Sequence, residues 1–215
     1  MQWVDNETPG LARSWFAVAL DSELGDEPLT VTLLGQHFEI ARGDERVTER
    51  YGLVWFAPRD PVCPIPAFDE WCDPSFDRTM NEPRRTPVSA VQLTDNFLDA
   101  THLPFVHTTT FGVDRAGTLP PHDVHRDGWR AWTTYVTPYR NHDDPLVATG
   151  EHPLVQEHHL FKELAPATTA LIRLWFPLTG STLAILFACL PEHRSSTRVF
   201  MLARTPESCL QSYIA

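Results

Sequence analysis

The sequence has little that would direct it to a membrane or to nucleic acid. Its 17 Lys and Arg residues are outnumbered by 28 Asp and Glu, which gives 215 residues a net charge of -11. This acidic charge is spread along the chain and disfavours nucleic acid and anionic lipid as partners. Apolar runs stay well short of the roughly 20 residues of a membrane span, and the first residues lack the pattern of a signal peptide. We therefore expect a cytoplasmic protein that binds neither membrane nor nucleic acid.

Cysteine is also scarce and has no ligand spacing. The spacing of the cysteines forms neither a C-x-x-C nor a C-x-H motif, so it indicates neither a zinc site nor an iron-sulfur cluster; they are Cys63, Cys72, Cys189 and Cys209. We expect buried or half-exposed thiols. The hydrophobic content of 42% is enough for one globular domain, with or without a small appended lobe.

Alternating apolar residues dominate the first part of the chain. Residues 29–34 and 37–42 flank Gly35-Gln36 and predict a β-hairpin, and the apolar run 51–56 predicts another strand with no further element between them. Proline and acidic residues then dominate residues 57–87, which favours a long irregular connection.

The second part of the chain predicts one helix followed by a meander. Apolar positions between Val91 and His107 suit a helix broken at Pro104. Thr205-Pro206-Glu207 has the residues of a helix start. Between them we expect antiparallel strands that form one curved sheet around an apolar pocket, at residues 128–137, 154–163, 168–176, 181–190 and 198–204.

Two histidines and a carboxylate gather at the end of the predicted helix. Asn96, Asp99, His102 and His107 form the pattern N-x-x-D-x-x-H-x-x-x-x-H. Two imidazoles from one helical segment and a remote carboxylate make the facial triad that leaves positions open on Fe(II). The alternative is that both histidines are ordinary residues with satisfied hydrogen bonds.

This motif resembles the iron-binding segment of the α-subunits of Rieske non-heme iron oxygenases, the family of the aromatic ring-hydroxylating dioxygenases. Residues 15–19 and 33–42 look like the opening of the family's Rieske domain, and residues 51–55 look like its end. The resemblance covers most of the chain. It implies that His102 and His107 ligate iron, that Asn96 lines the site, and that Asp99 links iron to a neighbouring cluster.

The sequence departs from that family in two places. Between Arg42 and Tyr51 the family carries the C-x-H and C-x-x-H pair of its [2Fe-2S] cluster, and this chain has eight residues without Cys or His. The family's third iron ligand is a carboxylate in a long C-terminal helix, and this sequence reaches Ala215 before an equivalent position. Glu207 lies too near the start of that helix to replace it. We therefore expect no cluster, and either no metal or weakly bound Fe(II) at His102 and His107.

The resemblance implies an α+β fold of the helix-grip (START-like) type, in which an antiparallel sheet wraps a C-terminal helix. Residues 1–60 would be a β-rich remnant of a Rieske-like lobe, residues 61–87 an irregular connection, and residues 88–215 the catalytic-like domain. Such a fold encloses a cavity for one hydrophobic small molecule.

Other polar and aromatic residues receive simpler interpretations. His158 and His159 point to opposite faces of a strand, so at most one enters the pocket. The loop Asn141-His142-Asp143-Asp144 is expected to be a solvated turn. Core packing is expected for the aromatic side chains of one strand, namely Trp129, Trp132 and Tyr135.

Without a cluster the residues favour an enzyme that uses its cavity for a redox-neutral cyclisation, cycloaddition or rearrangement of a polyketide-like molecule in specialised metabolism. Asn96, Asp99, His102 and His107 would polarise the substrate. One alternative is an Fe(II) oxygenase that receives electrons from a separate protein. Another is a non-catalytic partner subunit or ligand carrier. A homo-oligomer is left open.

Overall fold

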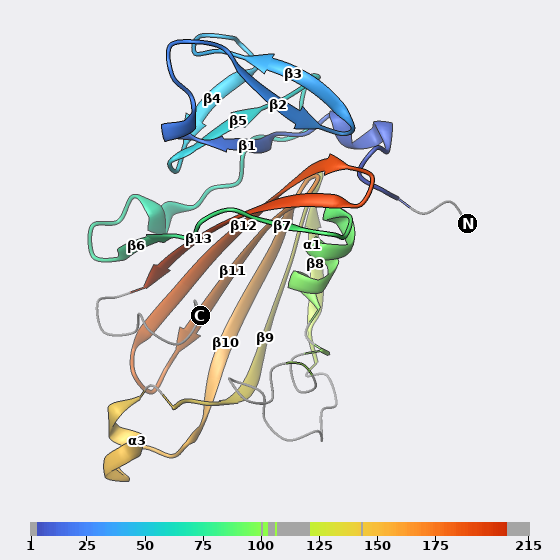
Figure 1. Cartoon of the computed structure of the whole chain (residues 1–215). Coiled ribbons are helices and arrows are strands. Elements are labelled where there is room, and N and C mark those ends of the chain that lie inside the picture. The colour runs from blue at the N-terminus through green and yellow to red at the C-terminus, as the bar shows by residue number, and fades with distance from the viewer. Residues whose placement is uncertain (1–3, 100, 103–105, 107–120, 143, 206–215) are drawn as a thin grey trace.

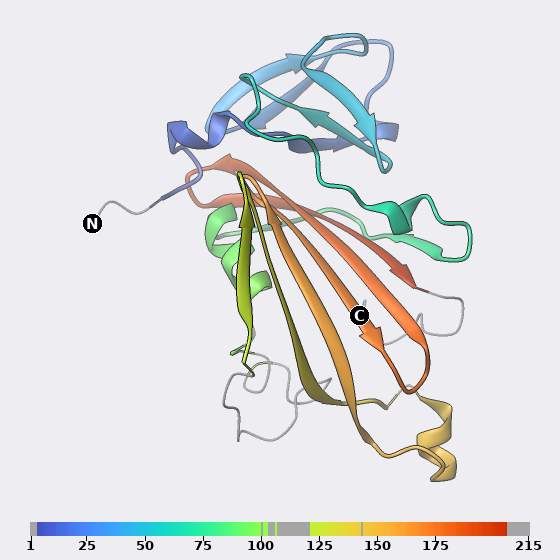
Figure 2. The same cartoon turned by 180° about the vertical axis from the view of Figure 1, so that it is seen from behind.

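The computed structural model describes residues 4–99, 101–102, 106, 121–142 and 144–205. This part of the chain is mostly β-sheet. Figure 1 shows the N-terminal strands as a layer at one end of a sheet with much longer strands, and Figure 2 shows the same arrangement from behind. None of the described helices is long and apolar enough to cross a membrane.

The N-terminal layer contains a three-stranded antiparallel sheet and a hairpin. The sheet has the order β1-β5-β4, and β2 pairs with β3. Leu34 and Gly35 have φ of 54° and 74°, and Tyr51 and Gly52 have φ of 62° and 76°, so both tight turns use two left-handed residues. At Gly52 a Cβ atom would also lie 2.8 Å from the Met80 side chain. The strands are β1 (Phe16–Leu20), β2 (Leu29–Leu33), β3 (Gln36–Ile40), β4 (Val47–Arg50) and β5 (Leu53–Phe56).

The predicted hairpin is confirmed, although its turn is centred one residue earlier than expected. The expectation that no element lies between the hairpin and Tyr51 is wrong, because β4 lies there. Its pattern is weak, with Val47 half-buried and three exposed residues after it.

The large sheet is antiparallel and has eight strands in the order β6-β13-β12-β11-β10-β9-β8, with β7 also pairing with β13. The predicted meander is confirmed, with small differences in its bounds. The strands are β6 (Asp77–Met80), β7 (Arg84–Thr86), β8 (Asp123–Asp127), β9 (Arg130–Arg140), β10 (Val155–Ala165), β11 (Thr169–Phe176), β12 (Ser181–His193) and β13 (Ser196–Thr205). The short strands β6 and β7 lie within residues 57–87, which were expected to be irregular. They form because each pairs with β13, a distant partner that the local sequence does not reveal.

The described helices are few and short. The predicted helix 91–107 breaks earlier than the expected position at Pro104, since α1 (Ala90–Leu98) ends before Asp99, whose ψ of 134° leaves the helical region. Val106 is again helical, whereas residues 100, 103–105 and 107 lie outside the described residues. Helix α3 (Pro145–Thr149) lies at the far end of the large sheet in Figure 1. The 3₁₀ helices are Pro9–Ala12, Asp21–Glu23 and Asp69–Trp71. Thr205 ends β13, and the expected C-terminal helix after it lies outside the described residues.

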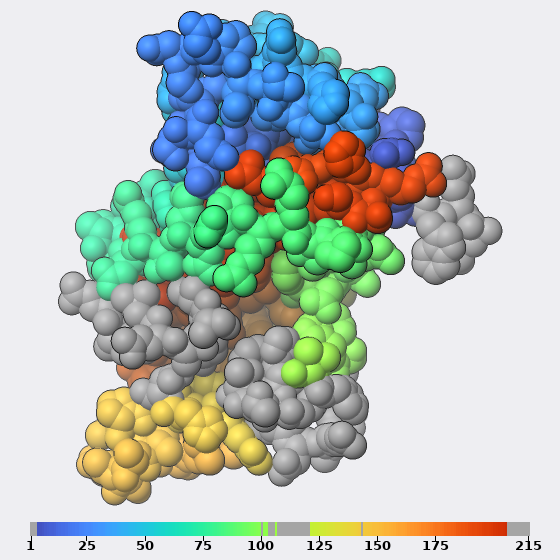
Figure 3. Space-filling model, in the orientation of Figure 1, coloured from blue at the N-terminus to red at the C-terminus, as the bar shows by residue number. Residues whose placement is uncertain are grey.

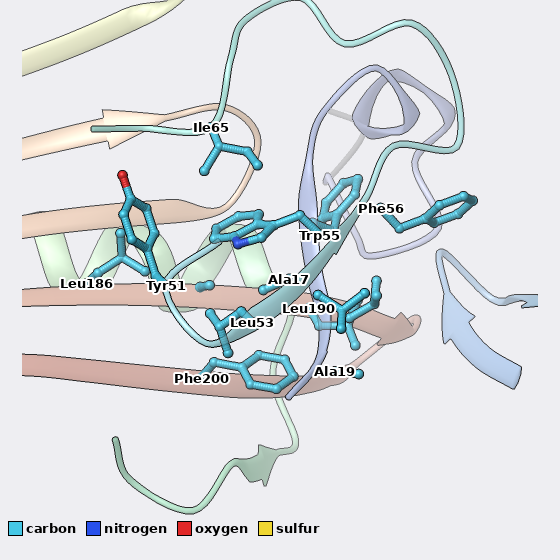
Figure 4. Close-up of a cluster of buried hydrophobic side chains, with 14 of the residues drawn as sticks. Ala17, Ala19, Tyr51, Leu53, Trp55, Phe56, Ile65, Leu186, Leu190 and Phe200 are labelled. Carbon is cyan, nitrogen blue, oxygen red and sulfur yellow. The ribbon is translucent and has the colours of Figure 1, made fainter. Parts of the chain in front are cut away.

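One hydrophobic core joins the N-terminal layer to the large sheet. Figure 4 shows Leu53 and Trp55 of β5 facing Leu190 of β12 and Phe200 of β13. All four side chains are at most 2% exposed. In Figure 3 the red residues of β12 and β13 accordingly lie directly against the blue N-terminal residues. This burial fixes the end of the sheet on which α1 packs.

Candidate functional site

A mostly apolar cavity lies between α1 and one face of the large sheet, and we call it the α1 cavity. Its volume is about 310 Å³. Phe97 of α1 stacks on Phe187 of β12 with ring centroids 4.0 Å apart, which closes one side. The other lining side chains are polar at Asn96, His102, Tyr139, His158 and Lys162 and apolar at Leu160, Ile172, Leu174, Leu183, Ile185 and Met201.

Local sequence and a distant contact both fix the start of α1. Ser89 caps the helix, because its Oγ accepts from the amide of Gln92 and the Gln92 side chain accepts from the Ser89 amide. Asn6 adds a tertiary contact, since its Oδ1 accepts from the Ala90 amide at 2.7 Å. The N-terminal segment thus helps to place the helix that carries Asn96 over the sheet.

Asp99 and His102 form a hydrogen-bonded pair at the end of α1. Asp99 Oδ2 lies 3.1 Å from His102 Nδ1, and Asp99 Oδ1 accepts from the amide and hydroxyl of Thr101 at 2.8 and 2.6 Å. Burial opposes ionisation, but hydrogen bonds from Thr101 and His102 outweigh it and lower the pKa of Asp99 to about 2. A carboxylate that is hydrogen-bonded to Nδ1 orients the imidazole so that Nε2 can accept or donate a proton.

Lys162 is the buried cation of the cavity and was missed by the sequence analysis. It is 3% exposed, and Nζ donates to the carbonyl oxygens of Leu98 and Asp99 at 3.3 and 3.0 Å. Burial lowers its pKa to about 8, although the Asp99 charge opposes this. An inward-facing lysine in the strand pattern is the only sequence signal that could have found it.

His158 lies deeper in the same cavity. Burial, and then the charge of Lys162, lower its pKa to about 4, so the ring is neutral at pH 7. Its Nε2 lies 2.8 Å from the Thr137 hydroxyl, while Nδ1 is buried without a hydrogen-bond partner in the described part of the chain. His159 lines a hollow on the opposite face of the sheet with Trp175, as the strand alternation predicts.

The structure brings together three of the four residues singled out in the sequence. Asn96 and His102 line the cavity, and Asp99 contacts His102. His107 lies outside the described residues. Among residues 4–205 as far as they are described, no three His, Cys, Asp or Glu side chains are grouped so that they could hold a metal ion. The His102–Asp99 pair suits one iron ligand with its orienting carboxylate, but these residues alone do not make an iron site.

The family's cluster does not fit the residues between β3 and β4. Cluster irons need thiolate or imidazole ligands, and this segment has neither. Its charged side chains Asp44 and Arg46 instead form an ion pair at 3.1 Å.

Two simpler interpretations need correction. Trp129 is 57% exposed and does not pack in the core, because it lies in the turn between β8 and β9. Trp132 is half-buried and stacks on the exposed His125 ring, whereas Tyr135 is 6% exposed as expected. The loop Asn141-His142-Asp143-Asp144 is not simply a solvated turn. Asn141 and Asp144 are buried, because both join a hydrogen-bond network with Gln156, and only His142 is exposed; Asp143 lies outside the described residues.

Comparisons with known proteins place the chain in a family. Residues 87–211, more than half of the chain, match the family of the vanillate O-demethylase oxygenase C-terminal domain. A putative toluene-4-sulfonate monooxygenase system iron-sulfur subunit, TsaM2 of Comamonas testosteroni, is 34% identical over 101 residues, which are 46% of this chain and 29% of that protein. A probable methylxanthine N7-demethylase, NdmC of Pseudomonas sp. (strain TJI-51), is 35% identical over 83 residues, 36% of this chain and 27% of that protein. The matched part is thus less than a third of each curated relative.

Solved structures show the same fold over nearly all of this chain. Pseudomonas putida CBB5 NdmA with caffeine aligns with a TM-score of 0.76 and 17% identity, covering 98% of this chain and 79% of that one. Dicamba monooxygenase bound to dicamba aligns with a TM-score of 0.68 and 15% identity, covering 94% and 79%. Together with the motif at Asn96 to His102, these matches show that the chain belongs to the vanillate O-demethylase oxygenase C-terminal domain family of Rieske-type oxygenases.

Proposed function

We propose that the chain is an enzyme that binds a hydrophobic, polyketide-like small molecule in the α1 cavity and catalyses its redox-neutral cyclisation or rearrangement. The observation that carries this proposal is the Asp99–His102 pair beside an apolar cavity that also holds Lys162 and His158. A hydrogen-bonded carboxylate and imidazole are the usual means of moving a proton at neutral pH.

The reaction we assign to these residues needs no electrons. His102 takes a proton from one atom of the bound substrate and returns it to another, while Asp99 supports the transient imidazolium. Lys162 polarises a substrate oxygen from its buried position, where a charge acts through a medium of low dielectric constant. The apolar walls hold the reacting atoms together and exclude water. We also propose that the fold is a helix-grip arrangement, in which a C-terminal helix packs over the sheet.

A second candidate is oxygenation, which the names of the relatives favour, since they are a monooxygenase subunit and a demethylase. Iron held at His102 and His107 would then supply the chemistry of O2. Because the segment between β3 and β4 has no cluster ligands, the electrons would have to come from a separate protein. If the protein catalyses neither reaction, the alternative is that it acts as a ligand carrier or as a non-catalytic partner subunit.

The deciding assay uses a panel of aromatic polyketide substrates with metal-stripped protein under anaerobic conditions. A product of unchanged mass and altered retention time supports the proposal, provided that His102→Ala lowers the rate about 10²-fold, the typical contribution of one acid–base group. His159→Ala is the matched control, because that ring lies on the opposite face of the sheet. A product that gains an oxygen atom only with iron and a reductase contradicts the proposal and supports oxygenation.

A further inference from the structure

A second hollow lies beside α3. Figure 1 shows α3 at the end of the sheet away from the N-terminal layer. We call it the distal compartment; its volume is about 330 Å³. Aromatic and aliphatic side chains form its walls, among them Phe176 and Leu146. Its polar residues are Asn141, Asp144, His152, Thr179, Ser181, Thr182 and Thr205.

Tyr139 and Leu183 line both the α1 cavity and the distal compartment, so the two spaces adjoin. The Tyr139 ring lies 4.7 Å from the ring of His158, which lines the α1 cavity, and 5.1 Å from the ring of Phe176, which lines the distal compartment. A row of rings therefore runs from one space to the other. A flat, elongated molecule suits such a row, because aromatic faces and edges pack well at these spacings.

The distal compartment contains an acid–histidine pair of its own. Asp144 Oδ2 lies 2.6 Å from His152 Nδ1 and accepts from Gln156 Nε2 at 2.7 Å, and Asn141 Nδ2 donates to Gln156 Oε1 at 2.9 Å. The Asp144 residue is 4% exposed, whereas the His152 side chain is 20% exposed. The buried Asp144 carboxylate accepts from three donors, the third being the Leu146 amide. These groups form a buried hydrogen-bond network whose geometry is fixed by the fold.

We infer that the distal compartment binds the hydroxyl-bearing end of an elongated aromatic substrate, with His152 as the residue that selects the hydroxyl group. This inference rests on the proposed function for the other end of the same molecule, which would lie beside His102.

The chemistry of the pair favours a hydroxyl group. Burial opposes the charge of Asp144, but hydrogen bonds from His152 and Gln156 outweigh it and lower the pKa of that carboxyl. An ionised Asp144 accepts the proton on His152 Nδ1, and in the tautomer that carries this single proton Nε2 is an acceptor for a phenolic O–H. The hydroxyl groups of Thr179 and Ser181, 2.6 Å apart, line the same compartment and can donate to the substrate oxygen, which accepts equally as a phenol or as a methyl ether.

The test measures binding by isothermal titration with 4-hydroxystilbene and 4-methoxystilbene. Only the first can donate a hydrogen bond, and the second carries an additional methyl group, so a preference that comes from size alone would survive in His152→Phe. The wild type should bind the hydroxyl compound about tenfold more tightly, the usual effect of one hydrogen bond to a buried acceptor. In His152→Phe both compounds should bind equally. His142→Phe, an exposed histidine of the neighbouring loop, is the matched control and should keep the preference.

Equal binding of the two compounds by the wild type, or a preference that survives in His152→Phe, overturns the inference. If His152→Phe does not fold, as judged by thermal unfolding, His152→Lys serves instead, because its ammonium group can donate to Asp144 but cannot accept from a phenol, so the hydroxyl preference should again be lost. His102→Ala separates the two proposals, since it should lower turnover about 10²-fold and keep the hydroxyl preference. Loss of that preference in His102→Ala also counts against the distal compartment.

Discussion

Lys162 on β10 connects the sheet to the end of α1, because its Nζ donates to the carbonyl oxygen of Asp99 at 3.0 Å. The same Asp99 holds His102 through its side chain. Asp99 thus links the buried cation Lys162 to the imidazole of His102. Substitutions at Lys162 or Asp99 should therefore change both the stability of the fold and the site.

Replacing Lys162 with Met should make stability less dependent on alkaline pH. The pKa of Lys162 is about 8 in the folded protein and 10.5 in the unfolded chain, so the unfolded chain binds more protons between these values. The wild-type free energy of unfolding should therefore rise through this window relative to Lys162→Met, by at most about 3 kcal/mol. Urea unfolding of both proteins at pH 7, 8.5 and 10 measures this difference; a constant difference would contradict it.

Replacing Asp99 with Asn should slow any proton transfer at His102. The amide keeps the size of the side chain but removes the charge that orients and supports the imidazolium. We expect kcat to fall about 10²-fold with little change in KM. Asp95→Asn, one turn earlier on α1 and exposed, is the control. A similar loss of kcat in the control would mean that the charge acts on the whole helix.

The same carboxylate should add acid sensitivity to the fold. Its pKa lies below the usual 3.8, at about 2, so its contribution to stability is present above pH 4 and is lost as the pH falls toward 2. Asp99→Asn should lose less stability than the wild type across that range. Circular dichroism during acid titration of the two proteins measures this.

Replacing His158 with Phe should remove a different part of the acid sensitivity. Burial lowers the pKa of His158 to about 4, so below pH 6.5 the unfolded chain binds a proton that the folded protein does not. Wild-type stability should fall between pH 6.5 and 4, and the fall should be smaller in His158→Phe. His159→Phe, the next residue, is the control. An identical pH dependence in wild type and His158→Phe would show that the ring is not held neutral.

Replacing Phe200 with Ala should destabilise the junction of the two sheets. Phe200 of β13 is fully buried, and Figure 4 shows its ring beside Leu53 of β5. Removing a buried aromatic ring leaves a cavity and costs about 3–5 kcal/mol. Denaturant unfolding followed by tryptophan fluorescence measures the loss, because Trp55 lies in the same core. A loss below about 1 kcal/mol would indicate that the two layers are not coupled through this side chain.

Iron should bind weakly, if it binds, and through His102 and His107. The described residues group no three His, Cys, Asp or Glu side chains that could hold a metal ion, and two imidazoles alone hold Fe(II) poorly. Anaerobic titration with Fe(II), followed by dialysis against a chelator, should return the protein to its metal-free state with unchanged circular dichroism. The purified protein should also be colourless. Stoichiometric iron that survives the chelator, or that is unchanged in a His102→Ala, His107→Ala double variant, contradicts this prediction, and acid-labile sulfide contradicts the absence of a cluster.

The sequence by itself determined the parts that depend on local pattern. Alternation of apolar residues gave the strands of the meander, and the Asn96 to His107 motif indicated the family that the comparisons confirm. The alternation also placed His158 and His159 on opposite faces. These features depend on neighbours in the chain, so they can be seen in one sequence.

Only the tertiary structure decided which distant groups meet. Strands β6 and β7 form because β13 offers an edge, and α1 ends at Leu98 although apolar residues continue beyond it. The buried positions of Lys162 and Asp144 could not be predicted, because a charged side chain in a strand or loop is normally solvated. These charged groups can be buried only because backbone carbonyls, an imidazole and an amide from other elements form hydrogen bonds with them. These partners come close only in the folded chain.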